Sequence, residues 1–143
     1  MDRRSFIRAG VVGGVAAATV SNIAKADHVA TKSFGAGALY YTKENPGRWA
    51  KKVAGHAPLV DAKKAGNKAE VMITTPHEMR GYEHYIVKHT LLDENMHVLS
   101  EKVFDPTKDK SPISKHTIEG YSGKLYAISV CNLHDAWVTE ATV

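Results

Sequence analysis

The chain has a single cysteine, Cys131, in 143 residues, so it cannot form an internal disulfide. Proteins of oxidising compartments usually carry cysteines in pairs. A lone thiol in such a protein is typical of a metal ligand, a nucleophile or a residue that is simply buried. The chain also lacks a long hydrophobic run. Its longest, from Ala9 to about Val20, contains glycines and is shorter than the ~20 residues that a membrane-spanning helix needs.

The chain also lacks a large excess of positive or negative charge. The whole chain has 19 basic and 15 acidic residues. Residues 1–26 contribute four basic residues and one acidic residue, which leaves 15 minus 14, or +1, for residues 27–143. Because no basic residues gather into a stripe or cluster, the composition excludes a nucleic-acid-binding face. We expect neither a nucleic acid nor a membrane as a partner of the part that follows residue 26.

The N-terminus has the pattern of an export signal. A basic segment with paired arginines precedes the Gly/Ala-rich apolar stretch, and small residues then follow at Ala24-Lys25-Ala26. This order predicts a signal peptide over residues 1–26. The paired arginines resemble a twin-arginine signal, although Asp2 stands where Ser or Thr is usual. The signal predicts a periplasmic protein. Its basic segment reads Arg3-Arg4-Ser5-Phe6-Ile7-Arg8.

The remaining chain is long enough for one domain with its own core. We expect an N-terminal extension over residues 27–50, attached to the domain through Trp49, and a loop from Lys51 to Pro58. After this loop, short β-branched and aromatic runs alternate with polar turns, which predicts an all-β, antiparallel sandwich of about seven strands over residues 51–143. The expected strands are 69–74, 84–92, 98–104, 113–119, 124–131 and 136–142.

Four histidines accompany the cysteine in positions that suit a metal. His134 lies three residues after Cys131, near the end of an expected strand. His77 and His84 flank a short loop between two strands, and His56 lies in a loop that Pro58 ends. Loops from several strands meet at one end of a sandwich. Cysteine sulfur and histidine nitrogen together suit zinc, copper or iron. Spacing alone leaves two alternatives open: one shared site, or scattered surface histidines.

The other four histidines are not expected to bind metal. His28 lies beside the cleavage point, and we expect His97 and His116 to be surface residues. His89 lies within an expected strand, so we expect a partly buried histidine that makes a hydrogen bond.

Three short motifs in order resemble the iron domain of the superoxide reductases, the desulfoferrodoxin and neelaredoxin family. The C-terminal motif Cys-Asn-x-His reads Cys131-Asn132-Leu133-His134. The family's His-Pro-Met element and the strand start after it correspond to His77-Glu78-Met79 and Glu83-His84-Tyr85-Ile86, and its Glu-Lys-His-Val-Pro element to Ala54-Gly55-His56-Ala57-Pro58. The resemblance extends over roughly residues 46–140.

This resemblance implies an immunoglobulin-like sandwich with one mononuclear non-haem iron at its end. By motif match, four imidazoles are equatorial ligands, one thiolate is the axial ligand and the sixth position is open. The implied activity is one-electron reduction of superoxide to hydrogen peroxide, with electrons from an external donor protein. The implied ligands, which are also the catalytic residues, are His56, His77, His84, His134 and Cys131.

The chain departs from the family at residues that usually assist catalysis. The family's glutamate and lysine before the first histidine are replaced by Ala54 and Gly55, and Asp135 replaces a glycine. Glu78 stands in place of proline. Candidates for the missing cation are Lys51, Lys52 and Arg80.

Two other functions remain open at this stage. A cupredoxin-like electron carrier is also a small exported sandwich with a Cys and a nearby His, although no methionine follows Met96 to complete a blue-copper site. A non-catalytic accessory sandwich that binds metal is the second alternative, since a fold does not fix a function. Exposed sheet edges would also allow a homo-oligomer.

Overall fold

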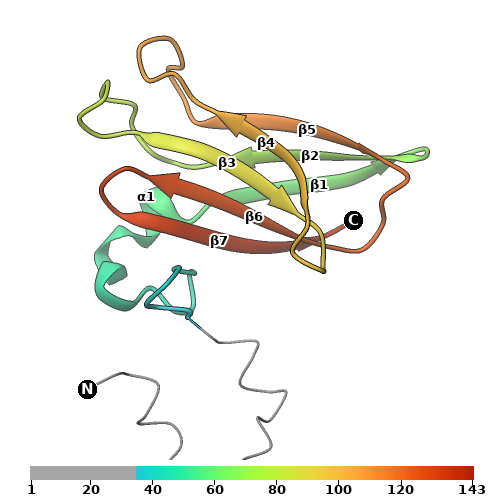
Figure 1. Ribbon diagram of the computed structural model, residues 1–143, viewed down its shortest axis with the longest axis horizontal. Coiled ribbons are helices and arrows are strands. Elements are labelled where there is room, and N and C mark those ends of the chain that lie inside the picture. The colour runs from blue at the N-terminus through green and yellow to red at the C-terminus, as the bar shows by residue number, and fades with distance from the viewer. Residues whose placement is uncertain (1–34) are drawn as a thin grey trace, which may run out of the picture. The chain divides into compact units, whose positions relative to one another are not determined.

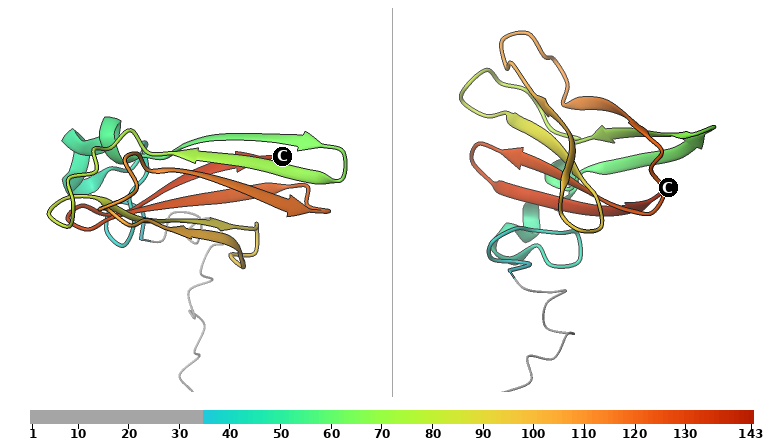
Figure 2. Two further views of the ribbon diagram at one scale, coloured as in Figure 1. Left: turned by 90° about the horizontal axis from the view of Figure 1, so that it is seen from above. Right: turned by 45° about the vertical axis from the view of Figure 1, so that its right-hand side comes forward.

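A computed structural model describes residues 35–143, which form seven antiparallel strands in two facing sheets (Figures 1 and 2). The three-stranded sheet has the order β1-β2-β5, and the four-stranded sheet has the order β4-β3-β6-β7. The all-β sandwich of about seven strands is therefore confirmed. The strands are β1 (Leu59–Ala65), β2 (Lys68–Thr74), β3 (Ile86–Leu92), β4 (Val98–Val103), β5 (Ile113–Glu119), β6 (Lys124–Cys131) and β7 (Asp135–Thr142).

The expected signal peptide and His28 lie outside the described residues. Within residues 35–143, no helix has the length and apolar character needed to cross a bilayer.

Alternating side chains build the core between the sheets. Every second residue of β2 and of β6 is buried, as a strand with one face on a core requires. Each large aliphatic side chain that is fully buried there contributes about 1.5–3 kcal/mol relative to an exposed one. The main apolar cluster comprises Val71, Ile73, Leu91, Leu125 and Ala127.

Strand β1 was not among the six expected from sequence. It pairs along its whole length with β2 and forms an edge of the smaller sheet. Only Val60 and Ala62 of β1 are partly buried, while Asp61 and Lys63 face solvent. The alternation of apolar residues in β1 is too weak to predict a strand. Backbone pairing with β2, rather than burial of side chains, stabilises it. Gly66, with a φ of 62°, makes the tight turn between the two strands.

The segment before the sandwich is folded onto it. The 3-10 helix η2 (Gly47–Lys52) and the short helix α1 (Val53–His56) replace most of the loop expected at 51–58. Tyr41 is 2% exposed; its N–H donates to Ala136 O and its carbonyl accepts from Val138 N–H, at 2.9 and 2.8 Å. The described part of the expected extension, 35–50, belongs to the same compact unit as the strands. Strand β7 is therefore partly covered at the sheet edge.

A row of hydrogen-bonded polar side chains connects the two sheets of the sandwich. His89 of β3 contacts Thr75 Oγ1 through Nε2 at 2.9 Å and Ser114 Oγ through Nδ1 at 2.8 Å. Ser114 continues to His116 Nε2 at 2.8 Å, and His116 Nδ1 reaches Ser100 Oγ at 2.7 Å. Each imidazole in its neutral form donates one hydrogen bond and accepts one, so the row satisfies both rings.

These hydrogen bonds explain why the prediction for His116 is wrong: the residue is 5% exposed and is not a surface residue. Its neighbours Lys115 and Thr117 face outward, while His116 lies on the inward face of β5 with Ser114. Because its sequence neighbours are polar, the sequence did not indicate that His116 is buried. His89 is buried and hydrogen-bonded as expected, although more completely than predicted, and His97 is exposed.

Burial, and secondarily the nearby His116, lower the pKa of His89 from 6.5 to about 4. The native state therefore holds the ring neutral, while the unfolded chain takes up a proton below pH 6.5. Stability from this group is complete above pH 6.5 and is lost as pH falls towards 4, by up to about 3 kcal/mol.

We predict that His89→Gln lowers the free energy of unfolding at pH 7 and also flattens its decline between pH 6.5 and 4. Urea unfolding of the metal-free protein at several pH values measures both effects. His97→Gln is the matched control, since His97 is exposed beside Asp93. A constant difference between wild type and His89→Gln over this range would contradict the assignment.

Candidate metal centre

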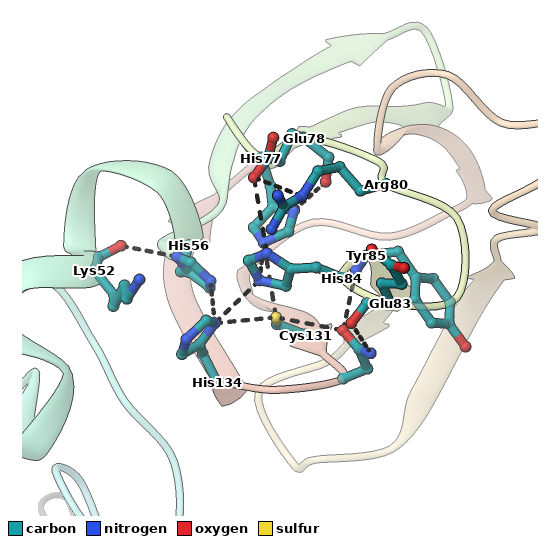
Figure 3. A network of polar contacts seen from close by, with 11 residues as sticks. Lys52, His56, His77, Glu78, Arg80, Glu83, His84, Tyr85, Cys131 and His134 are labelled. Atoms are coloured by element: carbon teal, nitrogen blue, oxygen red, sulfur yellow. Dashed lines mark hydrogen bonds and ion pairs between the residues drawn. The ribbon is translucent and has the colours of Figure 1, made fainter.

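Three separate parts of the chain bring five donor residues to one end of the sandwich (Figure 3). His56 ends α1, and His77 and His84 lie in the connection between β2 and β3. Cys131 is the last residue of β6, and His134 lies in the loop before β7. The five donor atoms all lie within 4.8 Å of one another. The structure thus gathers all five residues singled out from the sequence.

Three successive distances between imidazole nitrogens suit neighbouring ligands of one metal ion. His56 Nε2 lies 3.0 Å from His134 Nδ1, which lies 3.1 Å from His84 Nε2, and that atom lies 3.0 Å from His77 Nε2. Neighbouring ligand atoms at right angles and 3.0–3.1 Å apart would lie about 2.1–2.2 Å from a shared ion, near the ~2.0–2.1 Å of a metal–imidazole bond. Cys131 Sγ lies 3.5 Å from His134 Nδ1 and 3.7 Å from His77 Nε2.

The outward-facing nitrogens determine where the protons are. His56 Nδ1 donates to the Lys52 carbonyl at 3.0 Å, and His77 Nδ1 donates to the Glu78 carbonyl. A carbonyl only accepts, so in the neutral rings these outer nitrogens carry the hydrogens and both Nε2 atoms present lone pairs to the centre.

Hydrogen bonds alone cannot satisfy this cluster. With lone pairs fixed on His56 and His77, His84 Nε2 and His134 Nδ1 can each donate to one of them. The 3.1 Å contact between His84 and His134 then joins two N–H groups. A cation at the centre, which accepts all four lone pairs, resolves this conflict. The donor set therefore fits a bound metal ion.

Burial prepares the imidazoles for a metal. His56 and His84 are 4% and 8% exposed. Burial, together with the neighbouring His77, lowers the pKa of His56 to about 4. Burial is also the main cause of the lowered pKa values of His77, His84 and His134. Neutral rings are the form that binds metal.

Two effects shift the pKa of the Cys131 thiol in opposite directions. Burial raises the pKa of the Cys131 thiol, while backbone hydrogen bonds from Leu133 and His134 lower it. These N–H groups stabilise the thiolate that a metal requires.

Asn132 joins the cysteine turn to the loop that carries His84. Its Oδ1 accepts from Tyr85 N–H at 3.0 Å, and its Nδ2 donates to the carbonyls of Tyr82 and Glu83 at 3.3 and 3.1 Å. The backbone N–H of Asn132 donates to Tyr85 O at 3.1 Å. These bonds explain why an amide side chain follows the cysteine, a role that spacing alone did not reveal.

Lys52, one of the three candidate cations, lies beside His56 and His134 (Figure 3). Its charge contributes to the lowered pKa values of His84 and His134. Arg80 also affects His84, but its guanidinium lies 3.1 Å from Glu78 and is paired there. Lys52 has no ion pair among the described residues, so its charge is less compensated than that of Arg80.

Sequence reasoning missed the part played by Arg48 and by Asp135. The Asp135 carboxylate accepts from Arg48 at 2.6 Å and from Trp49 Nε1 at 2.8 Å. These bonds hold the pKa of Asp135 below its usual range. Trp49 does anchor the N-terminal segment, as expected, but its partner could not be read from a local pattern because it lies 86 residues away.

Fold and site together define a β-sandwich protein with a mononuclear metal centre. The sequence model of the desulfoferrodoxin family matches residues 48–140. The chain therefore belongs to the desulfoferrodoxin family.

Solved structures agree with this assignment. A variant of the superoxide reductase (neelaredoxin) from Ignicoccus hospitalis is 28% identical, with a TM-score of 0.63 over 73% of this chain and 93% of that one. A variant of the Archaeoglobus fulgidus protein in the reduced form is 25% identical, with a TM-score of 0.54 over 66% and 91% of the two chains. The Nanoarchaeum equitans superoxide reductase, at 22% identity and a TM-score of 0.55 over 63% and 94%, shares the fold. The comparison with curated proteins gives no match.

Proposed function

We propose that the protein is a superoxide reductase with one mononuclear iron. The reaction is O₂•⁻ + e⁻ + 2H⁺ → H₂O₂, and it forms no O₂. The observation that carries this proposal is the convergence of four imidazole nitrogens and one cysteine sulfur within 4.8 Å. The iron would be held by His56, His77, His84, His134 and Cys131.

The donor count separates iron from the other metals considered. A structural zinc site takes four ligands in a tetrahedron, whereas five donors converge here. A blue-copper site uses two histidines, one cysteine and a weak axial ligand, whereas four imidazoles meet here. Five protein donors leave one position of an octahedron for a small substrate. This open position favours a catalytic centre over a purely structural one.

The residues around the centre have distinct tasks. When bound, iron would supply the electron that superoxide accepts. Cys131 would share its thiolate charge with the metal, and the N–H groups of Leu133 and His134 would moderate that donation. The carbonyls of Lys52 and Glu78 fix the orientation of two imidazole rings. The next electron must come from outside, because the single cysteine is already used and cannot build a second centre of the cysteine-ligated type.

Lys52 takes the place of the cation that Gly55 cannot provide. Superoxide is an anion, so a positive side chain near the site raises its association rate. A lysine ammonium also orders water and can pass a proton to the product. Lys52 is near enough to influence three donors, His84, His134 and Cys131.

We predict that Cys131→Ser keeps the fold but loses most reductase turnover and the visible thiolate-to-iron absorption of the oxidised protein. A hydroxyl is a harder and weaker donor than a thiolate. Absorption spectra, iron analysis and superoxide consumption by the reduced protein measure these effects. Retention of the visible band, or of full turnover, would show that Cys131 is not a ligand.

We predict that Lys52→Ala slows the second-order reaction with superoxide by about tenfold at low ionic strength and weakens its salt dependence. Pulse radiolysis of the reduced, iron-loaded protein measures both, with Lys51→Ala as the control. Gly55→Lys should restore part of the rate in the Lys52→Ala background, because a Cβ added at Gly55 would meet only Pro76 O, at 3.5 Å. Equal rates for Lys52→Ala and wild type would exclude Lys52 as the cation.

We further propose that the protein acts in the periplasm after twin-arginine export. The support is the order of paired arginines, apolar stretch and small residues in residues 1–26. This route carries folded proteins, so iron could be loaded before export.

We predict that the double change Arg3→Lys with Arg4→Lys retains the precursor in the cytoplasm. Both charges persist in this variant, so only the arginine pattern is lost. Cell fractionation with an antibody against the protein measures the outcome. Undiminished delivery of the double variant to the periplasm would point to a different export route.

A further inference from the structure

We propose that Asp135, Trp49 and Arg48 form a positioning clamp for His134, through which the segment before the sandwich sets the geometry of the metal site. The identity of the metal rests on the proposed function, but the clamp itself does not. Its contacts join residues 48 and 49 to the turn that carries His134, and to each other.

His134 needs such support more than His56 and His77 do. It lies in the three-residue loop between Cys131 and Asp135, which are paired across the β6–β7 ladder. Its neighbour Leu133 is 54% exposed, so the loop has little packing on that side. Among the described residues, no hydrogen-bond partner contacts His134 Nε2. By contrast, carbonyl groups hold the outer nitrogens of His56 and His77.

Trp49 takes the place of the missing hydrogen bond. Its ring meets the His134 ring edge to face, with centroids 4.7 Å apart and an angle of 89° between the planes. An aromatic contact of this kind fixes a ring without a proton at a particular nitrogen. Trp137 Nε1 donates to the His134 carbonyl at 2.9 Å. One tryptophan therefore holds the backbone of His134, and the other holds its ring.

Asp135 is what holds Trp49 there. Its carboxylate accepts from Trp49 Nε1 at 2.8 Å and from Arg48 at 2.6 Å. The Arg48 guanidinium also lies over the Trp49 ring, 4.8 Å from its centroid. Two contacts thus hold the indole directly, and the Arg48–Asp135 ion pair links them. Tyr41, paired with Ala136 and Val138 of β7, attaches the same segment at a second point.

The backbone of Asp135 points to a role for its side chain. Its φ is 63°, in the left-handed region where a three-residue hairpin loop commonly ends and where glycine is the easiest residue. Aspartate tolerates this region better than most residues but is still strained relative to glycine. Here the carboxylate of the strained residue makes two hydrogen bonds to the segment that contacts His134.

Arg48 also removes an electrostatic cost of the clamp. An unpaired carboxylate next to the metal site would repel an anionic substrate. The ion pair with Arg48 neutralises it, although the partly exposed side chains, 65% and 40%, keep the pair weak in itself. Its value lies in position and charge balance rather than in stability.

The test is the metal affinity of the metal-free full-length protein for Co²⁺, followed through its thiolate and d–d absorption bands. The variants are Asp135→Gly, Asp135→Asn, Trp49→Ala and the double change Asp135→Gly with Trp49→Ala. Glu140→Gln is the matched control, because it breaks the ion pair of Glu140 with Lys124 on the same pair of strands. Urea unfolding of each metal-free variant reports stability separately.

We expect Asp135→Gly and Trp49→Ala each to weaken Co²⁺ binding by about 10–100-fold and to change the d–d bands. The double variant should be no weaker than the weaker single variant, because both remove the same clamp. Asp135→Asn, which keeps an acceptor for Trp49, should bind close to wild type. Should Asp135→Gly fail to fold, Trp49→Ala and Asp135→Asn still test the clamp.

The clamp is wrong if Trp49→Ala and Asp135→Gly bind Co²⁺ with wild-type affinity and spectrum, or if their effects simply add. This outcome is separate from failure of the proposed function. If the wild-type iron protein does not reduce superoxide but the variants lose Co²⁺ affinity as described, the clamp stands and the reductase assignment fails.

Discussion

Four imidazole lone pairs and one buried sulfur must share a space of less than 5 Å, and this requirement governs the end of the sandwich at which they meet. Without a cation, at least one contact between these neutral rings would join two N–H groups or two lone pairs. Strand pairing resolves the placement problem. Ile86 pairs with Cys131, and Cys131 pairs with Asp135, so the β3–β6–β7 ladders bring the start of one strand and the end of another to the same level. Short loops are then sufficient to place His84 and His134 beside Cys131.

The two groups of buried histidines show how partners determine chemistry. Burial lowers the pKa of His89 and of His56 to about 4, so both rings are neutral. Around His89, hydroxyl groups can donate or accept on either side, and the ring is satisfied within the core. Around His56, the Lys52 carbonyl accepts the ring's only proton, and the inner lone pair points at a cluster of imidazole nitrogens that hydrogen bonds alone cannot satisfy. Similar burial therefore gives a structural residue in one place and a metal ligand in the other.

Charges around the site are arranged so that positive charge near the metal is preserved. Arg48 offsets Asp135, and Arg80 is paired with Glu78. Lys52 keeps its charge free of ion pairs among residues 35–143, on the side of His56 and His134 (Figure 3). Ala54 and Gly55 stand where the sequence resemblance implies a glutamate and a lysine, so one anion and one cation are absent together. In the proposed mechanism Lys52 supplies the cation from the preceding turn, and its carbonyl also orients His56.

The sequence by itself determined the sandwich class, most of its strands and the five donors, because alternation of buried residues and the spacing of His and Cys are local signals. It did not reveal β1, whose polar residues are held by pairing, or the burial of His116, whose neighbours are polar. It named three candidate cations near the metal site without a choice between them, and it identified Asp135 only as a departure from the family's glycine. Tertiary structure decided these points: the partners of Asp135 are 86 and 87 residues away, and the orientation of Lys52 depends on how a short helix docks beside strands far along the chain. Such contacts arise only when distant segments pack, because no periodicity in the chain records which side chains will meet.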